Sequence, residues 1–128
     1  MSWGEAAPTK FYGETAETVM EVLQTYAQHL PADPFALEET DRRLETALRG
    51  NPSARAALSA AMHDLVGKRL GVPVYKLWGL DPAKAPMSTF TIGVDTPERI
   101  RMKVHEAAEY PILKIKLGSA DDVARLNA

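Results

Sequence analysis

The last third of the chain holds two short strand-like runs with a helix between them. Residues 88–94 and 112–117 alternate polar and apolar side chains, and a helix is expected over residues 96–109. Strands joined through a helix pair in parallel, and a parallel sheet normally has both faces covered. One β-α-β unit cannot cover both faces of its own sheet. The pattern therefore predicts one part of a larger α/β fold.

Each predicted strand has one polar and one apolar face. Side chains two apart on a strand share a face, so Thr89 lies with Thr91. Lys114 and Lys116 share a face in the same way, and the residues that alternate with them are apolar. The apolar face can pack on helices, which would turn the Thr/Lys face inward, as in a β/α barrel with catalytic groups at its mouth.

The segment Lys114-Ile115-Lys116 is the candidate for chemistry. Two ammonium groups held close together lower each other's pKa, and burial lowers it further. A lysine tuned in this way can act as a base near neutral pH. A Lys-x-Lys on a strand more often forms the solvated face of an ordinary sheet, because lysine is rarely buried. The tripeptide alone leaves both interpretations open.

The rest of the chain is predicted to be mainly helical. Apolar residues recur at helical spacing in three segments, residues 14–30, 36–49 and 51–70. Residues 80–86 have the proline-rich composition of a linker. We therefore expect one part at residues 1–86 and another at residues 87–128, without an internal repeat.

Local signals predict how these helices begin. Glu14 and Glu17 would stabilise the positive end of the first helix. Asn51, followed by Pro52, would cap the third. Residues 119–122 would cap a last helix, with two aspartates favoured by its dipole.

Composition excludes several classes of function. A net charge of −2 gives no basic surface for nucleic acid, and the absence of cysteine excludes disulfides, thiolate zinc sites and cysteine nucleophiles. No apolar run reaches the ~20 residues that span a bilayer, and residues 1–5 do not resemble a signal peptide. The expected location is cytoplasmic.

Other candidate site residues are better explained by structure. His63-Asp64 on the third helix lacks further ligands at metal-binding spacing, and His29 and His105 are isolated residues expected to face solvent. Asp121-Asp122 is better explained by the helix dipole than by a cation site. Gly-rich phosphate loops and Ser-His-Asp arrangements are absent from the sequence.

A longer pattern gives a family resemblance. Residues 54–68, ARAALSAAMHDLVGK, are followed by Gly-Val-Pro at 71–73 and Leu-Trp-Gly at 77–79. This pattern resembles the enolase superfamily, and more narrowly its mandelate-racemase/muconate-lactonizing branch. Residues 89–97 and 110–118 look most like the dipeptide epimerases of that branch. The resemblance covers essentially the whole chain.

The resemblance implies a two-part enzyme with an α+β capping domain and a (β/α)7β barrel. Residues 1–86 would be the C-terminal part of the capping domain, mostly helical, with residues 4–8 as the end of its third strand. Residues 87–128 would be the first β-α-β of the TIM-like barrel. The chain would then be a fragment, truncated at both ends.

The resemblance also implies residue roles. Lys116 would be the acid/base on one face of the substrate α-carbon, and Lys114 would assist it electrostatically. Thr89 and Thr91 are candidates for substrate binding. Mg²⁺ is the implied cofactor, but its three carboxylate ligands and a second catalytic lysine would lie beyond Ala128. No metal ligand is therefore assigned within this chain.

Two kinds of alternative stay open. The implied reaction is epimerisation of a dipeptide such as Ala-Glu through an enolate, but muconate cycloisomerases and o-succinylbenzoate synthases share the Lys-x-Lys. Alternatively, the chain is a non-catalytic, self-associating helical module. Exposed sheet edges favour pairing with a second copy, so a homo-oligomer is expected. The isolated chain is expected to be inactive and to bind no metal, nucleic acid or membrane.

Overall fold

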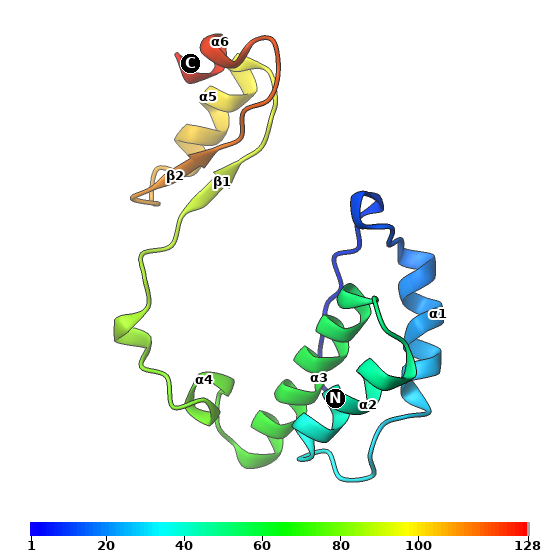
Figure 1. Cartoon of the computed structure of the whole chain (residues 1–128). Helices are drawn as coiled ribbons and strands as arrows, with labels where there is room; N and C mark the ends of the chain where they lie inside the picture. The colour runs from blue at the N-terminus through cyan, green and yellow to red at the C-terminus, as the bar shows by residue number, and fades with distance from the viewer. Residues whose placement is uncertain (128) are drawn as a thin grey trace. The chain divides into compact units, whose positions relative to one another are not determined.

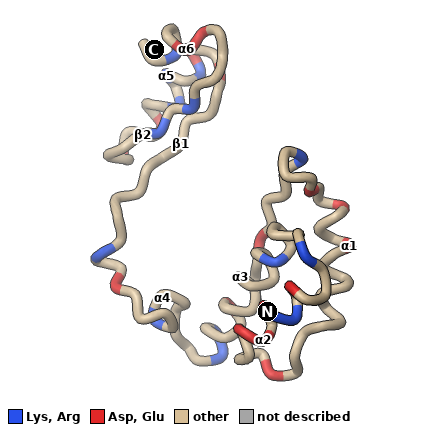
Figure 2. Tube along the Cα trace, viewed as in Figure 1, with Lys and Arg blue, Asp and Glu red and all other residues tan. Residues whose placement is uncertain are grey.

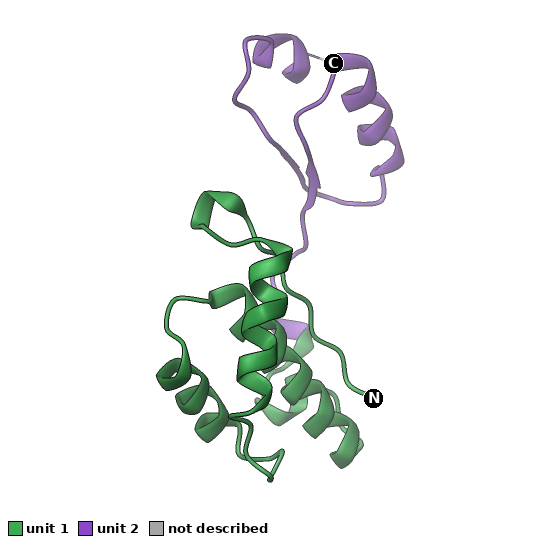
Figure 3. Ribbon diagram, turned by 90° about the vertical axis from the view of Figure 1, so that its right-hand side faces the viewer, with its two compact units in different colours: residues 1–82 green, residues 83–128 purple. Residues whose placement is uncertain are grey.

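The computed structural model describes residues 1–127, and their contacts divide the chain into two compact units (Figure 3). The first unit is residues 1–82, and the second begins at Ala83. This division falls within the predicted linker at residues 80–86. The assignment of a domain boundary at residue 86 stays a prediction.

Three helices form most of the first unit: α1 (Ala16–Ala27), α2 (Leu37–Ala47) and α3 (Pro52–Leu70). The long helix α3 contacts both α1 and α2, which also contact each other (Figure 1). The 3-10 turn η1 (Lys10–Tyr12) is a short addition to this unit, and η2 (Pro82–Lys84) spans the residues where the first unit ends and the second begins. The mostly helical first part of the chain is thus confirmed.

A short helix, α4 (Val74–Leu77), was not predicted from the sequence. Gly71 ends α3 in the left-handed conformation, with φ of 68°, as its position suggests. Pro73 then stands before a new turn of helix, because its fixed φ suits the residue that precedes a helix.

The core of the first unit lies where α1, α2 and α3 meet. Its buried residues are Val19, Tyr26, Leu44 and Ala54. Tyr26 is fully buried, and its hydroxyl donates a hydrogen bond to the Leu48 carbonyl at 2.8 Å. The polar end of this ring therefore has a partner inside the core, as buried tyrosines require.

Glu14 joins the start of α1 to the start of α3. Its side chain is buried, and its two carboxylate oxygens accept hydrogen bonds from the Ser53 amide at 3.0 Å and the Ser53 hydroxyl at 2.6 Å. The prediction that Glu14 lies in the first turn of its own helix is wrong, because α1 begins at Ala16 with Thr15 as its cap. The carboxylate instead satisfies a free amide at the positive end of α3.

Asn51 does not cap α3, which corrects a second prediction. Its side chain makes no hydrogen bond to the first turn of α3, and its amide nitrogen donates to the Arg49 carbonyl at 3.1 Å. Glu14 takes the capping role, so Asn51 stabilises the preceding turn. Pro52 does occupy the first helical position, as predicted.

The N-terminal segment lies along α3. The Asp64 carboxylate accepts hydrogen bonds from the Trp3 amide at 2.7 Å and from Lys68 Nζ at 2.6 Å. At Gly4 the segment comes so close to α3 that a Cβ atom would overlap the helix backbone. Asp64 is therefore a structural residue, which agrees with the interpretation drawn from the sequence.

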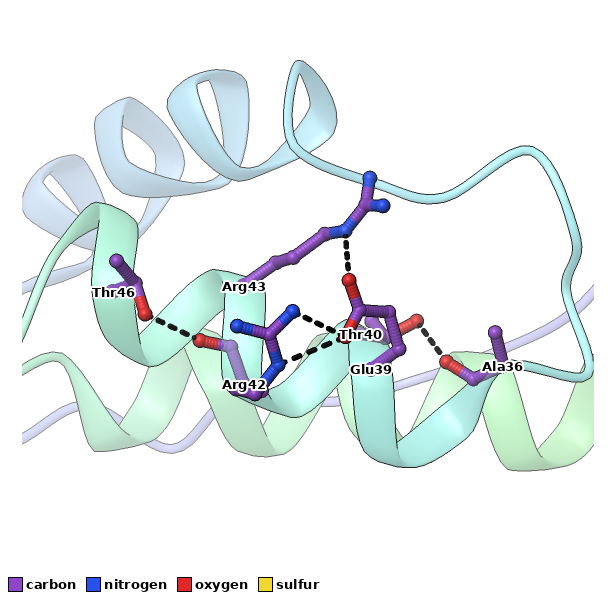
Figure 4. Close-up of polar contacts among 6 residues, drawn as sticks. All are labelled: Ala36, Glu39, Thr40, Arg42, Arg43 and Thr46. Atoms are coloured by element: carbon purple, nitrogen blue, oxygen red, sulfur yellow. Dashed lines mark hydrogen bonds and ion pairs between the residues drawn. The ribbon is translucent and has the colours of Figure 1, made fainter.

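Helix α2 carries polar contacts along its length, some exposed and one at the buried residue Thr40 (Figure 4). Glu39 accepts hydrogen bonds from Arg42 at 2.6 Å and from Arg43 at 2.7 Å, and the Thr40 hydroxyl donates to the Ala36 carbonyl at 2.8 Å. Water screens such exposed ion pairs, so they stabilise α2 only weakly. Basic and acidic residues are interspersed along the trace in Figure 2, in keeping with a net charge near zero.

The second unit is a β-α-β unit followed by a short helix. Its elements are β1 (Phe90–Ile92), α5 (Pro97–Glu106), β2 (Leu113–Ile115) and α6 (Asp122–Leu126). The two strands pair in parallel, and α5 contacts β1. Ile92 and Ile100 are each 1% exposed and form the core between sheet and helix. The predicted parallel β-α-β is confirmed, although α5 ends three residues earlier than the predicted 109.

We expect Glu14→Ala to lower the free energy of unfolding of the first unit by about 1–3 kcal/mol, because two donors of Ser53 lose their buried acceptor. Urea unfolding followed by tryptophan fluorescence measures this change, since Trp3 and Trp78 both lie in the first unit. Glu21→Ala, which removes an exposed glutamate of α1, is the matched control and should change stability by less than about 0.5 kcal/mol. Equal losses in the two variants would contradict the capping role.

The attachment of the N-terminal segment should depend on pH. Hydrogen bonds from Lys68 and from the Trp3 amide hold the pKa of Asp64 below its ordinary value of 3.8. A carboxylate with a lowered folded-state pKa stabilises the fold above its unfolded pKa, and this contribution is lost as the pH falls through the folded value. We therefore expect the segment to detach from α3 as the pH falls below 3.8.

The NMR signal of the Trp3 amide reports this detachment. Asp64→Asn should remove the pH dependence of that signal, whereas Asp33→Asn should preserve it, because Asp33 bonds to the Phe35 amide and not to the N-terminal segment. A Trp3 signal unchanged between about pH 5 and about pH 2 would show that Asp64 does not hold the segment.

Candidate active site

Thr91 and Lys114 lie on the same face of the two-stranded sheet. They are direct partners in the parallel register, between the Phe90–Leu113 and Ile92–Ile115 pairs. Directly paired residues in a sheet project from one face. The pairing continues beyond β2, because the Lys116 amide donates to the Ile92 carbonyl at 2.9 Å.

The period of two places Thr89 and Lys116 on this same face. We call these four residues, Thr89, Thr91, Lys114 and Lys116, the Thr/Lys face. All four side chains are exposed. The opposite face is apolar, and it includes Ile92, which is buried beneath α5.

The two lysines of the Thr/Lys face are exposed. Within residues 1–127, Nζ of Lys114 and Nζ of Lys116 make no hydrogen bond and no ion pair. Lys103, by contrast, bonds to the Asp95 carboxylate at 2.8 Å. Of these three lysines, Lys114 and Lys116 are therefore the ones with an ammonium group available to a small molecule lying over the sheet.

The loops after β1 and β2 are held together by a polar network that the sequence did not reveal. Asp122 accepts hydrogen bonds from the Gly118 amide at 2.9 Å and from the Ser119 amide and hydroxyl at 3.0 Å. Arg125 contacts Asp122 at 3.3 Å and donates to the Asp95 carbonyl at 2.6 Å. One arginine thus links the loop that follows β1 to the loop that follows β2.

The prediction for residues 119–122 holds for Asp122, which lies in the first turn of α6, but not for Asp121, whose side chain makes no capping hydrogen bond. The Asp122 carboxylate also accepts hydrogen bonds from the loop before the helix, which was not predicted. The Ser-x-x-Asp spacing of Ser119 and Asp122 is that of a capping box, and it could have revealed the contact.

The side-chain carboxylates of Asp95 and Asp122 are both stabilised in their charged form. The Lys103 ammonium and the Thr96 amide lower the pKa of Asp95. The amides of Gly118 and Ser119 lower the pKa of Asp122. Their hydrogen bonds favour the ionised carboxylate, so both are charged at neutral pH.

The three histidines of the chain show no sign of a catalytic or metal-binding role within residues 1–127. His63 Nδ1 lies 2.9 Å from the Ser59 carbonyl oxygen, and its ring packs edge-on against Trp78 at 5.3 Å between centroids. His29 and His105 are exposed, as predicted.

The described residues do not form a metal site. Within residues 1–127, no three histidine, aspartate or glutamate side chains come together closely enough to bind an ion. Asp95 and Asp122 are the acidic residues in the loops after β1 and β2. The Asp95 carboxylate already bonds to Lys103, and the Asp122 carboxylate already bonds to Arg125. In the same part of the chain, no helix has the length and apolar character required to cross a membrane.

Known proteins similar to this chain include dipeptide epimerases. The chain is 45% identical over 121 residues to the L-Ala-D/L-Glu epimerase of Bacteroides thetaiotaomicron, covering 94% of this chain and 32% of that protein. It is 35% identical over 127 residues to an L-Ala-D/L-amino acid epimerase of Pedosphaera parvula, covering 98% and 36%. The chain therefore spans about a third of the length of these relatives.

A solved structure gives the same fold. The dipeptide epimerase of Enterococcus faecalis, complexed with Mg and the dipeptide L-Leu-L-Tyr, superposes with a TM-score of 0.81 at 29% identity, covering 98% of this chain and 37% of that protein. Residues 2–79 match the family described as mandelate racemase / muconate lactonizing enzyme, N-terminal domain. The resemblance drawn from residues 54–79 is confirmed, and the chain belongs to the mandelate racemase / muconate lactonizing enzyme family.

Proposed function

We propose that this chain is part of a dipeptide epimerase and supplies the acid/base for one face of the substrate. The observation that carries this proposal is the position of Lys116. It lies where the β2 pairing ends, on the Thr/Lys face, with an ammonium group that has no partner within residues 1–127. The 45% identity to an L-Ala-D/L-Glu epimerase supports the choice of reaction.

In this proposal neutral Lys116 removes the α-proton of one amino acid of the dipeptide, which leaves an enolate. In the reverse reaction, protonated Lys116 returns a proton to the same face of the α-carbon. Lys114, two residues earlier on the same face, adds positive charge that favours the neutral form of Lys116 and stabilises the developing enolate. The apolar opposite face packs on α5, so the Thr/Lys face is the side available for substrate.

Thr91 and Thr89 are the proposed substrate-binding residues. Thr91 is the direct cross-strand neighbour of Lys114, so its hydroxyl can bond to a substrate that reaches the lysines. A small peptide is polar along its backbone, and hydroxyl groups provide both a donor and an acceptor for it. Thr89 lies two residues before Thr91 and extends the same polar row.

Magnesium belongs to the complete enzyme in this proposal. The Enterococcus faecalis protein is complexed with Mg, whereas residues 1–127 of this chain form no carboxylate cluster that fits the ion. We assign the metal ligands and a lysine for the opposite face to the part of the longer relatives that this chain does not match. No step assigned to Lys116 depends on metal ligands from this chain.

The other reactions considered from the sequence receive less support. The relatives from Bacteroides thetaiotaomicron and Pedosphaera parvula are named as epimerases, not as cycloisomerases or succinylbenzoate synthases. Self-association through the open edges of the sheet stays a prediction.

By itself, the 128-residue chain should show no epimerisation of L-Ala-D-Glu or L-Ala-L-Glu, with or without Mg²⁺. The physical reason is that residues 1–127 provide no metal site and no described group for the opposite substrate face. Proton NMR in D₂O measures exchange at the α-carbon directly. Turnover by the purified chain would contradict this division of the site.

A chimera tests the proposed role of Lys116. The full chain replaces the matched segment of the Bacteroides thetaiotaomicron epimerase, and exchange of the substrate α-proton is measured with each epimer. Lys116→Ala should reduce exchange of one epimer by about 10²–10⁴-fold, the usual contribution of a general acid/base. Lys84→Ala, at an exposed lysine of η2, is the matched control and should leave exchange within about twofold. Full activity of the Lys116→Ala chimera would show that the proposal is wrong.

A further inference from the structure

Arg125 connects the two loops that follow the strands of the Thr/Lys face. Its Nε donates to the Asp95 carbonyl after β1 at 2.6 Å, and its Nη1 contacts the Asp122 carboxylate at 3.3 Å. The arginine side chain is only 10% exposed, in contrast to the 67% exposure of Arg99, which also approaches Asp95. A nearly buried guanidinium that contacts two separate segments restrains both of them.

Asp122 completes the connection on the side of β2. Its carboxylate accepts hydrogen bonds from the amides of Gly118 and Ser119, the second and third residues after Lys116. Gly118 has a φ of 131°, a conformation that residues with a side chain rarely adopt. The Asp122 carboxylate fixes the backbone at Gly118 and Ser119, shortly after the lysine.

The backbone of Lys116 is therefore held from both sides. On one side, its amide bonds to the Ile92 carbonyl of β1. On the other, Asp122 binds the Gly118 amide, and Arg125 connects Asp122 to the loop after β1. The side chain of Lys116 itself has no partner within residues 1–127, so its position depends on how firmly this backbone is held.

We propose that Asp122 and Arg125 are positioning residues that fix the end of β2 so that Lys116 reaches the substrate α-carbon. This inference rests on the proposed function, because it needs Lys116 to be the acid/base. Proton transfer tolerates little misplacement, and an error of about 1 Å can reduce a rate by about 10²-fold. Loss of either residue should therefore slow proton transfer at Lys116 without removing the base.

A purely structural role makes a different prediction. General loosening of the unit would slow proton exchange at both faces of the substrate. Loss of positioning at Lys116 would slow exchange only at the face that Lys116 serves. The chimera with Lys116→Ala identifies that face, because the epimer whose exchange it abolishes is the one that presents its proton to Lys116.

The test compares Asp122→Asn and Arg125→Gln with two matched controls in the chimera that carries the full chain. Asp121→Asn removes the same charge from a neighbouring residue without a capping hydrogen bond, and Arg99→Gln removes an exposed arginine near Asp95. Asp122→Asn and Arg125→Gln should each slow exchange by about 10-fold or more at the Lys116 face and by less than about twofold at the other face. Both controls should change neither face by more than about twofold.

A second measurement uses the 128-residue chain itself. Amide hydrogen exchange at Gly118 and Ser119 should accelerate in Asp122→Asn, because these amides lose a charged acceptor, and should not change in Asp121→Asn. This readout needs no activity and shows whether the variant retains the rest of the unit.

The outcomes separate the two proposals. If Lys116→Ala slows neither face, the proposed function is wrong and the positioning role falls with it. If Lys116→Ala abolishes exchange at one face but Asp122→Asn and Arg125→Gln slow both faces equally, or neither, only the positioning role is wrong. Selective slowing at the Lys116 face, with accelerated amide exchange at Gly118, supports it.

Discussion

The parallel pairing of β1 with β2 determines which side chains of the second unit can take part in chemistry. Because Thr91 is paired with Lys114, the polar residues of both strands project from one face and the apolar residues from the other. A shift of the register by one residue would send Thr91 and Lys114 to opposite faces. The apolar face opposes that shift, because the shift would turn toward solvent either Ile92, now 1% exposed beneath α5, or the half-buried Leu113 and Ile115 of β2.

The first unit depends on a comparable constraint at the start of α3. Glu14 satisfies the Ser53 amide there, and Asp64, three turns further along, holds the N-terminal segment. Both contacts join residues far apart in the sequence, and each uses a carboxylate to accept a backbone amide. Helix α3 is thus fixed to its neighbours by specific polar contacts in addition to apolar packing.

Sequence periodicity was sufficient to predict the three long helices, the parallel β-α-β and the faces of its strands, because these depend on side-chain spacing within one segment. It did not predict the hydrogen bonds of Glu14, Asn51 and Asp122. The partner of Glu14 lies in another helix, and the partners of Asn51 and Asp122 lie in the loops that precede their helices. Only the fold brings Glu14 to Ser53, so no local rule could find that pair. The Asp122 contact was local enough to be found, but the contribution of Arg125 across two loops was not.

The central claim is that Lys116 acts on the α-carbon of a dipeptide that lies over the Thr/Lys face. A crystal structure of the chimera with a bound dipeptide tests it most directly. The claim predicts that Nζ of Lys116 lies about 3–3.5 Å from the α-carbon, on one side of it. A dipeptide bound elsewhere, or a Lys116 side chain directed into solvent away from the α-carbon, would contradict it.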